Sequence, residues 1–241
     1  MSFSFSLFGN RYYFTPKFTL TTLLLIMVLL AFSLWQWKAA IESGKTVDLI
    51  NKRLMLNPLQ IDDLDKHNDW RYYPIQLQGT FDNSHQILII NRIYKNQHGF
   101  QVLTPFHPAN SPKEILVNRG WLPGDPEHPR DIETTTDGVT ITGILFQPLN
   151  YFMFGSEFDE KNIHWPLPSK NINLEKFSAA IDNPVYPYVL LLSPNSPYGF
   201  VREWLWLSNS IEPARHVAFA KQWLVLALTV MLMFLLMNVH K

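Results

Sequence analysis

The sequence predicts a membrane protein in which two transmembrane helices flank an exported antiparallel β-barrel or β-sandwich domain with short helices. Three observations carry this prediction. The 241-residue chain has one long apolar segment near each end, and between them short stretches of alternating apolar and polar residues are separated by turn-forming residues. Strands do not alternate with helices along this middle part, which argues against Rossmann and P-loop architectures.

The first apolar segment, residues 18–37, has no charged residue, and about 20 helical residues cross the hydrocarbon core of a bilayer. A cleaved secretory signal would have a shorter apolar region that ends in small residues. The residues in that place are bulky or polar: Trp35, Gln36, Trp37 and Lys38. We therefore expect an uncleaved anchor whose helix continues outward over residues 39–56. A short helix is also expected over residues 62–68, because the acidic pair at its start suits the positive end of a helix dipole.

The second apolar segment, residues 215–239, is uncharged from residue 224 onward. Lys221 lies near its start, where a lysine side chain can extend to the lipid headgroups. A soluble domain of this size would not cover a helix with so long an apolar run and no polar face. We therefore expect a second transmembrane helix here.

The charged flanks of the two segments predict the orientation of the chain. Arg11 and Lys17 precede the first segment without an acidic neighbour, and basic flanks favour the cytoplasmic side of a membrane. We expect residues 1–17 and 240–241 to be cytoplasmic tails and residues 38–214 to form a periplasmic domain. The N-terminal tail lacks the Arg- and Ser-rich amphipathic pattern of a transit peptide, so the bacterial inner membrane is the expected location.

The middle of the chain shows the period-two pattern of β-strands. Expected strands cover residues 73–77, 87–93, 100–103, 115–117 and 139–144. The fourth is apolar throughout, so we expect it to be buried and to stop at the Gly-Trp-Leu-Pro corner of residues 120–123. Further along, Asn173 is a candidate N-cap for a helix over residues 174–181. Strands over residues 188–192 and 200–205 follow, and nearby prolines predict that they are short or lie at an edge.

Composition excludes several functions. Acidic and basic residues are equal in number, 20 each, and the basic residues form no stripe, so nucleic-acid binding is not expected. The chain has no cysteine, which removes disulfides, thiolate metal sites and cysteine nucleophiles. The sequence also lacks the motifs of phosphate-binding loops, serine hydrolases and zinc proteases. A membrane-tethered hydrolase stays an alternative that would require a pocket with a nucleophile and a base, which the sequence does not reveal.

Two groups of residues are candidates for function. The first continues the buried strand at 115–117 and comprises Asn118, Arg119, Gly120 and Trp121. Its arginine is suited either to a substrate carboxylate or to backbone carbonyls and an acid at the barrel corner. The second group centres on His216 at the outer mouth of the second apolar segment. Three residues share its helical face: Phe219, Ala220 and Trp223.

Two interpretations of His216 stay open at this point. Trp, Tyr, His and Lys side chains gather at membrane interfaces as amphipathic anchors, and Trp35 and Gln36 are expected at the same depth. Alternatively, an imidazole beside a slot between two apolar helices, with the small Ala220 next to it, supplies what a haem needs: an axial nitrogen, flat apolar walls and partners for the propionates. The cations near this level are Lys38, Arg215 and Lys221.

Several short motifs occur in a specific order along the chain: Trp35-Gln36, Gly79-x-Phe81, Gly99 with Thr104-Pro105, Val117 to Pro123, Gly143, and His216-x-x-Phe219-Ala220-x-x-Trp223. Together they resemble the surfeit-locus-one (Surf/Shy) family of cytochrome c oxidase assembly factors, over nearly the whole chain. The sequence departs from the family pattern at four positions. There Ser33, Ala39, Arg215 and Phe219 stand in place of glycine, arginine, asparagine and tyrosine.

The resemblance implies a membrane-bound assembly factor, not an enzyme, that helps haem a reach subunit I of a haem–copper oxidase. It carries the family's haem ligand onto His216. The other candidates are expected to line the porphyrin (Trp35, Gln36, Phe219 and Trp223) or to pair with a propionate (Arg215 and Lys221). The corner at residues 118–121 is expected to have a structural or docking role. Haem a synthase and membrane lipid are further expected partners, and the alternative is a cofactor-free scaffold that stabilises oxidase subunits.

Overall fold

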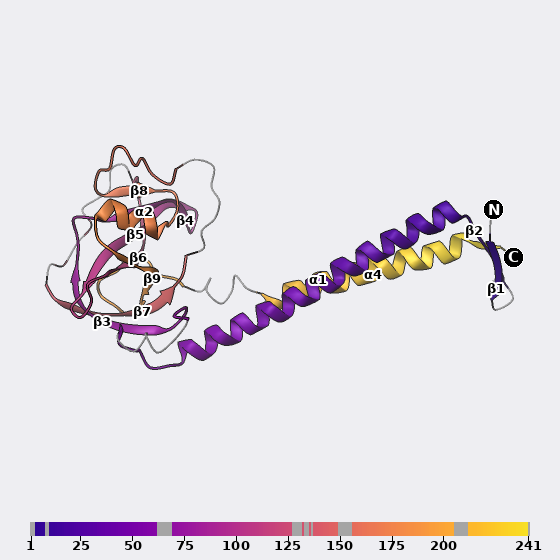
Figure 1. The fold of residues 1–241 in the computed structure, drawn as a ribbon, viewed down its shortest axis with the longest axis horizontal. Coiled ribbons are helices and arrows are strands. Elements are labelled where there is room, and N and C mark those ends of the chain that lie inside the picture. Colours follow the sequence, from indigo (N-terminus) through magenta and orange to yellow (C-terminus); the bar gives the residue numbers. More distant parts are fainter. Residues whose placement is uncertain are drawn as a thin grey trace. The chain divides into compact units, whose positions relative to one another are not determined.

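The computed structural model describes residues 3–7, 10–61, 69–126, 132, 135, 137–148, 156–204 and 212–240. The chain divides into two compact units, one made of residues 1–49 and 207–241 and the other of residues 50–206. Figure 1 shows the helices of the first unit and the strands of the second. The helix expected over residues 62–68 lies outside the described residues.

Two long helices dominate the first unit. α1 spans Pro16–Leu54 and α4 spans Pro213–Met237, and both are long and apolar enough to cross a membrane. Few of their apolar side chains are buried inside the protein, as expected for helices that face lipid. The rings of Phe18 and Phe234 lie 5.6 Å apart, so the start of α1 and the end of α4 are in contact. The prediction of two apolar helices around a β-rich domain is confirmed.

Short strands come before α1 and after α4 in the chain. β1 (Phe3–Leu7) and β2 (Asn10–Phe14) form an antiparallel hairpin, and β10 (Val239–His240) pairs with β2. The sequence predicts only tails here. The pairing joins the segment before α1 to the segment after α4 through backbone hydrogen bonds.

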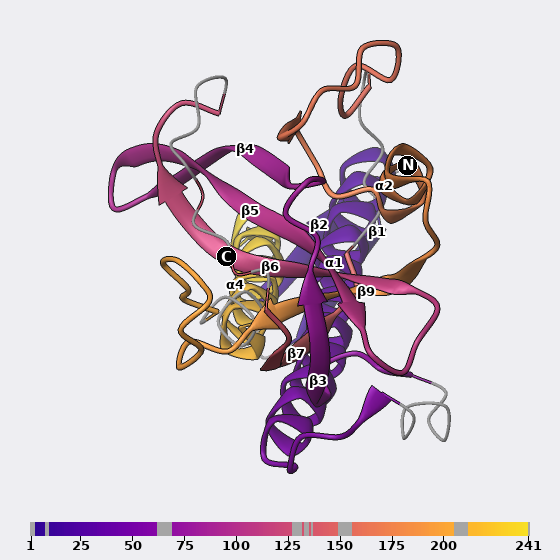
Figure 2. The same ribbon diagram turned by 90° about the vertical axis from the view of Figure 1, so that its left-hand side faces the viewer.

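The second unit is a closed β-barrel. Its strands are β3 (Pro74–Phe81), β4 (Ile87–Tyr94), β5 (Gln97–Pro108), β6 (Glu114–Pro123), β7 (Val139–Phe146), β8 (Leu167–Ser169) and β9 (Val185–Leu192). They follow the order β3-β7-β9-β6-β5-β4-β8, and a further pairing of β3 with β5 closes the barrel. Figure 2 shows β4, β5 and β6 following one another across the sheet. The barrel prediction is confirmed. β4 and β8 continue the sheet past β5, outside the closed ring of strands.

Among the strands that the structure describes, two pairings are parallel, β6 with β9 and β4 with β8, and the others are antiparallel. The strand over residues 188–192 was expected to be short or to lie at an edge. β9 instead runs over eight residues that include Pro187 and lies between β6 and β7, so both alternatives were wrong. The proline is tolerated because the β6–β9 register shifts between Glu114 and Leu116, next to the point where Pro187 falls.

Two further expectations require correction. β6 does not stop at residues 120–123 but continues through them to Pro123. The strand expected over residues 200–205 is reduced to one isolated bridge between Val201 and Trp121, and Leu205 lies outside the described residues. The helix expected over residues 174–181 is confirmed as α2 (Leu174–Ile181), in which the Asn173 side chain accepts from the Lys176 backbone N–H.

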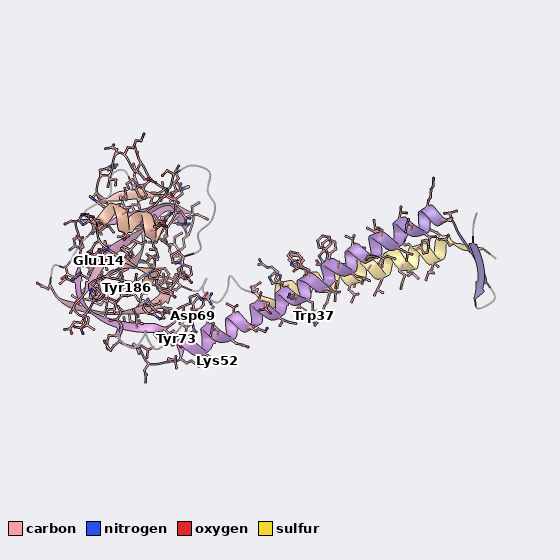
Figure 3. All side chains as sticks on the ribbon, in the orientation of Figure 1. Trp37, Lys52, Asp69, Tyr73, Glu114 and Tyr186 are labelled. Atoms are coloured by element: carbon pink, nitrogen blue, oxygen red, sulfur yellow. The ribbon has the colours of Figure 1, made fainter. Side chains whose placement is uncertain are left out.

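The core of the barrel is built by alternate residues of its strands. It includes Ile75, Leu77, Phe106, Val117, Ile141 and Leu190. The last turn of α1, from Ile50, belongs to this unit, and Ile50 is fully buried. Arg53 in this turn pairs with Asp69 at 3.1 Å and lies 4.4 Å from the ring centre of Tyr73, two residues that Figure 3 labels beside the end of the helix.

Candidate functional site

A hydrogen bond between α1 and α4 lies at the centre of the candidate site. Nδ1 of His216 is 2.8 Å from Oε1 of Gln36. A carbonyl oxygen only accepts, so Nδ1 is the donor in this contact, and in the neutral imidazole Nε2 then keeps its lone pair. A histidine held in this tautomer by a second residue is the form in which imidazole binds a metal.

The two helices pack directly on each other beside this hydrogen bond. The Ser33 hydroxyl donates to the Ala220 carbonyl at 2.9 Å, and Ala220 is only 1% exposed. The rings of Phe32 and Trp223 are stacked at 5.2 Å. Ser33, where the resembled family often has glycine, therefore adds a hydrogen bond between the helices. The expected slot between the helices is closed at this level, and Trp223 faces Phe32 across the contact.

The remaining candidates lie on the outer surface of the helix pair. Trp35 is 61% exposed and Phe219 is 42% exposed. Arg215 and Lys221 are also exposed, and the Arg215 guanidinium lies 3.5 Å from the Glu212 carboxylate. A flat ligand held by His216 would thus contact the outside of the pair, where aromatic and basic side chains are accessible. Within the described part of the chain no three His, Asp or Glu side chains group to hold a metal ion, so His216 would act as a single ligand.

The corner at residues 118–121 forms a β-bulge in the second unit. Val102 pairs with Gly120 and Leu103 pairs with Asn118, so Arg119 is the extra residue of the bulge. Gly120 has φ of +109°, and a Cβ there would lie 2.5 Å from the Val201 carbonyl oxygen. The bulge therefore requires glycine at position 120, both for its backbone conformation and for the close approach of a second segment.

The bulge holds the segment that follows β9. The Arg119 carbonyl accepts from the Phe200 N–H at 2.7 Å, and Trp121 exchanges two backbone hydrogen bonds with Val201. Arg119 Nε donates to the Tyr198 carbonyl at 2.8 Å, and the guanidinium lies between the rings of Phe81 and Phe200. Burial, with the nearby positive charge of Arg202, lowers the pKa of Arg119 to about 10. The Arg119 side chain thus contacts one backbone carbonyl and two aromatic rings inside the barrel domain.

Arg202 completes this arrangement, and no sequence motif identified it. Its guanidinium donates to four backbone carbonyls of one loop: Ser193, Pro194, Ser196 and Phe200. Such a fork of donors matches the geometry that arginine offers and lysine lacks. The prolines at 194 and 197 were a sequence signal for an irregular loop there, but nothing in the sequence pointed to its partner.

Comparison with known proteins shows the family to which the chain's sequence belongs. Residues 23–228 match the SURF1 family. The chain belongs to this family. Its relatives include Surfeit locus protein 1 of Mus musculus, 27% identical over 59% of this chain and 53% of the relative, and that of Homo sapiens, 26% identical over 59% and 54%. The protein of Xenopus tropicalis is 29% identical over 51% of this chain and 47% of the relative. The chain spans about half the length of these curated relatives.

The SURF1 family match covers both groups of candidate residues, the helix contact at His216 and the bulge at Arg119. In the group around His216, short motifs identified His216 and Gln36 but did not predict that the two side chains contact each other. No sequence pattern identified Phe32, which stacks on Trp223. The apolar sequence around Phe32 carries no signal that separates a residue facing the other helix from one facing lipid.

Proposed function

We propose that this SURF1-family protein is a membrane-bound assembly factor for a haem–copper oxidase that holds haem a transiently and passes it to subunit I. The hydrogen bond from His216 to Gln36 is the observation that supports this best, because it leaves Nε2 as a ligand for iron. Haem a is the cargo in this proposal, and haem a synthase is its expected donor. The protein itself supplies binding and release, so no catalytic residue is proposed.

The surroundings of His216 suit transient binding. Trp35 and Phe219 offer exposed flat surfaces, and Arg215 or Lys221 supplies a cation for a propionate. A single ligand on an open surface releases its cargo more readily than two ligands in a closed core. A bacterial inner membrane with both termini in the cytoplasm and the barrel in the periplasm is the setting that the charged flanks favour.

The test is the haem content of protein purified from cells that make haem a. We expect an absorption spectrum of bound haem a in the unchanged protein and its loss in His216→Ala. His216→Gln keeps a partner for Gln36 without an imidazole, so it separates loss of the ligand from loss of helix packing. His164→Ala changes an exposed histidine of the barrel domain and should retain haem. Equal haem content in all four proteins would reject the ligand role.

A cofactor-free scaffold for oxidase subunits is the second candidate. The direct packing of the helices at Ala220 favours it, because the space between them is filled by their own side chains. This candidate predicts that subunit I co-purifies normally with the His216→Ala protein. It also predicts equal haem content in preparations with and without haem a synthesis.

A further inference from the structure

A cavity of about 400 Å³ lies in the barrel domain beside the second half of β4. Aromatic side chains form much of its lining, with one cation and one carboxylate: Tyr94, Trp121, Trp204, Arg92 and Glu203. Trp121 and Trp204 are nearly buried, and both hold their orientation through indole hydrogen bonds to backbone carbonyls, of Arg92 and Leu192 respectively. The cavity is therefore built from fixed side chains.

Among the described lining residues Arg92 is the one cation, and no described residue neutralises its charge. The structure gives its guanidinium no ion pair or hydrogen bond within the described ranges, and its buried Nε is without an acceptor. The carboxylate of Glu203 instead accepts from the Tyr94 hydroxyl. Burial without such a partner lowers the pKa of Arg92. A half-buried guanidinium of this kind gains most from a carboxylate, which it can bind with two parallel hydrogen bonds.

The strand that carries Arg92 has an open outer edge. β8 pairs with β4 only at Ile87, Leu88 and Ile89, whereas β5 pairs with the other side of β4 as far as Tyr94. No described strand lies beside residues 90–94 on the outer side. Ile93 in this stretch is 65% exposed. An unpaired strand edge with an exposed aliphatic residue is a surface to which an extended segment can add.

The cavity and the open edge point to one kind of partner. In an added strand successive side chains alternate between the two faces of the sheet. One acidic side chain would therefore enter the cavity, while its two neighbours lie on the opposite face of the sheet. We propose that this cavity receives the acidic side chain of an extended segment of a partner polypeptide that adds to the outer edge of β4. The proposal does not depend on haem binding at His216.

The test uses a defined probe and the full chain in detergent. The probe is a dye-labelled pentapeptide, acetyl-Thr-Val-Asp-Val-Thr-amide, whose binding is followed by fluorescence anisotropy. A matched peptide has asparagine in place of the aspartate. A third peptide carries N-methyl groups on the backbone amides along one edge of the strand, which would otherwise donate hydrogen bonds to β4. A charge-assisted pair contributes more than a neutral one, so we expect about tenfold tighter binding of the aspartate peptide than of the asparagine peptide. The methylated peptide should not bind.

Variants of the protein assign the preference to the cavity. Arg92→Gln should remove the preference for aspartate, and Lys170→Gln, which removes an exposed cation elsewhere on the domain, should keep it. Equal binding of the aspartate and asparagine peptides to the unchanged chain would overturn the proposal, as would an unchanged preference in Arg92→Gln. Binding of the methylated peptide would exclude addition to the edge. Displacement of the peptide by succinate at a concentration equal to that of the peptide would identify a site for small carboxylates, and this result would also overturn the proposal.

Discussion

Nδ1 of His216 donates to Oε1 of Gln36 over 2.8 Å and so connects two helices whose contacting residues are 180 positions apart in the sequence. The contact gives each residue a function that neither has alone. Gln36 selects the tautomer of the imidazole, and His216 satisfies an amide that would otherwise be costly in an apolar surrounding. The pair is the smallest unit on which the proposed haem site depends.

Gln36→Leu should lower haem content even though leucine leaves His216 in place. Loss of the acceptor frees the imidazole to adopt the other tautomer, and comparable substitutions next to metal-binding histidines lower metal affinity by about 10–100-fold. Gln36→Glu, which still accepts from Nδ1, should retain haem. The measurement is haem a per protein after purification from cells that make it. Gln222→Leu alters an exposed glutamine of α4 and should have no effect, and equal retention in Gln36→Leu would refute a positioning role.

Ala220→Leu should separate the helices. Ala220 is 1% exposed and its carbonyl accepts from Ser33, so no room exists for a larger side chain. Overpacking of this kind costs about 1–3 kcal/mol. We expect a lower midpoint of thermal unfolding in detergent, together with reduced haem content because the contact of Gln36 with His216 is lost. Ala218 is exposed on the same helix, and a similar loss in Ala218→Leu would show that leucine itself, not the packing at Ala220, is responsible.

Gly120→Ala should destabilise the barrel domain by about 2–4 kcal/mol, which combines an unfavourable backbone conformation with a steric clash. The φ of +109° and the approach of the Val201 carbonyl are the structural causes. Denaturant unfolding followed by tryptophan fluorescence measures this effect. Gly138→Ala is the matched control, because a Cβ at Gly138 meets nothing within 4 Å. A cost equal to that of the control would contradict the close packing of the bulge on the segment after β9.

Elements that depend on local patterns were predictable from the sequence. The two apolar helices, the strands β3 to β7 and α2 with its cap Asn173 each rest on periodicity or capping within a few residues. Elements that depend on distant partners were not. β9 lies between β6 and β7 despite Pro187 because strand order is set by pairing across the barrel. The segment around Val201 has strand-like sequence, but Arg119 and Arg202 hold it as an irregular loop on the bulge.

The candidate site shows the same division. His216 and Gln36 were identified from short motifs, and the structure brings them together. Trp223 was expected to face a ligand but stacks on Phe32, because the small residues Ser33 and Ala220 allow the two backbones to approach closely. How closely the two helices approach depends on which residues of α1 face which residues of α4. These residues lie about 190 positions apart, and neither helical sequence alone shows which ones will face each other.

Glu114→Gln should make the barrel domain more stable relative to the unchanged protein as pH rises from 4 to 8. Glu114, labelled in Figure 3, is 5% exposed and its Oε1 accepts from the Asn183 amide. Burial, opposed by that hydrogen bond, raises the pKa of Glu114 above its ordinary value. Stability from a raised pKa is fully present below the unfolded value and is lost as pH rises through the folded one. Glutamine stays neutral and keeps the partner of Asn183, so the Glu114→Gln protein should not lose this stability.

Denaturant unfolding at several pH values measures the difference between the two proteins. Glu175→Gln, which changes an exposed glutamate, is the control. A stability difference that does not change with pH would contradict a raised pKa of the buried Glu114 carboxyl.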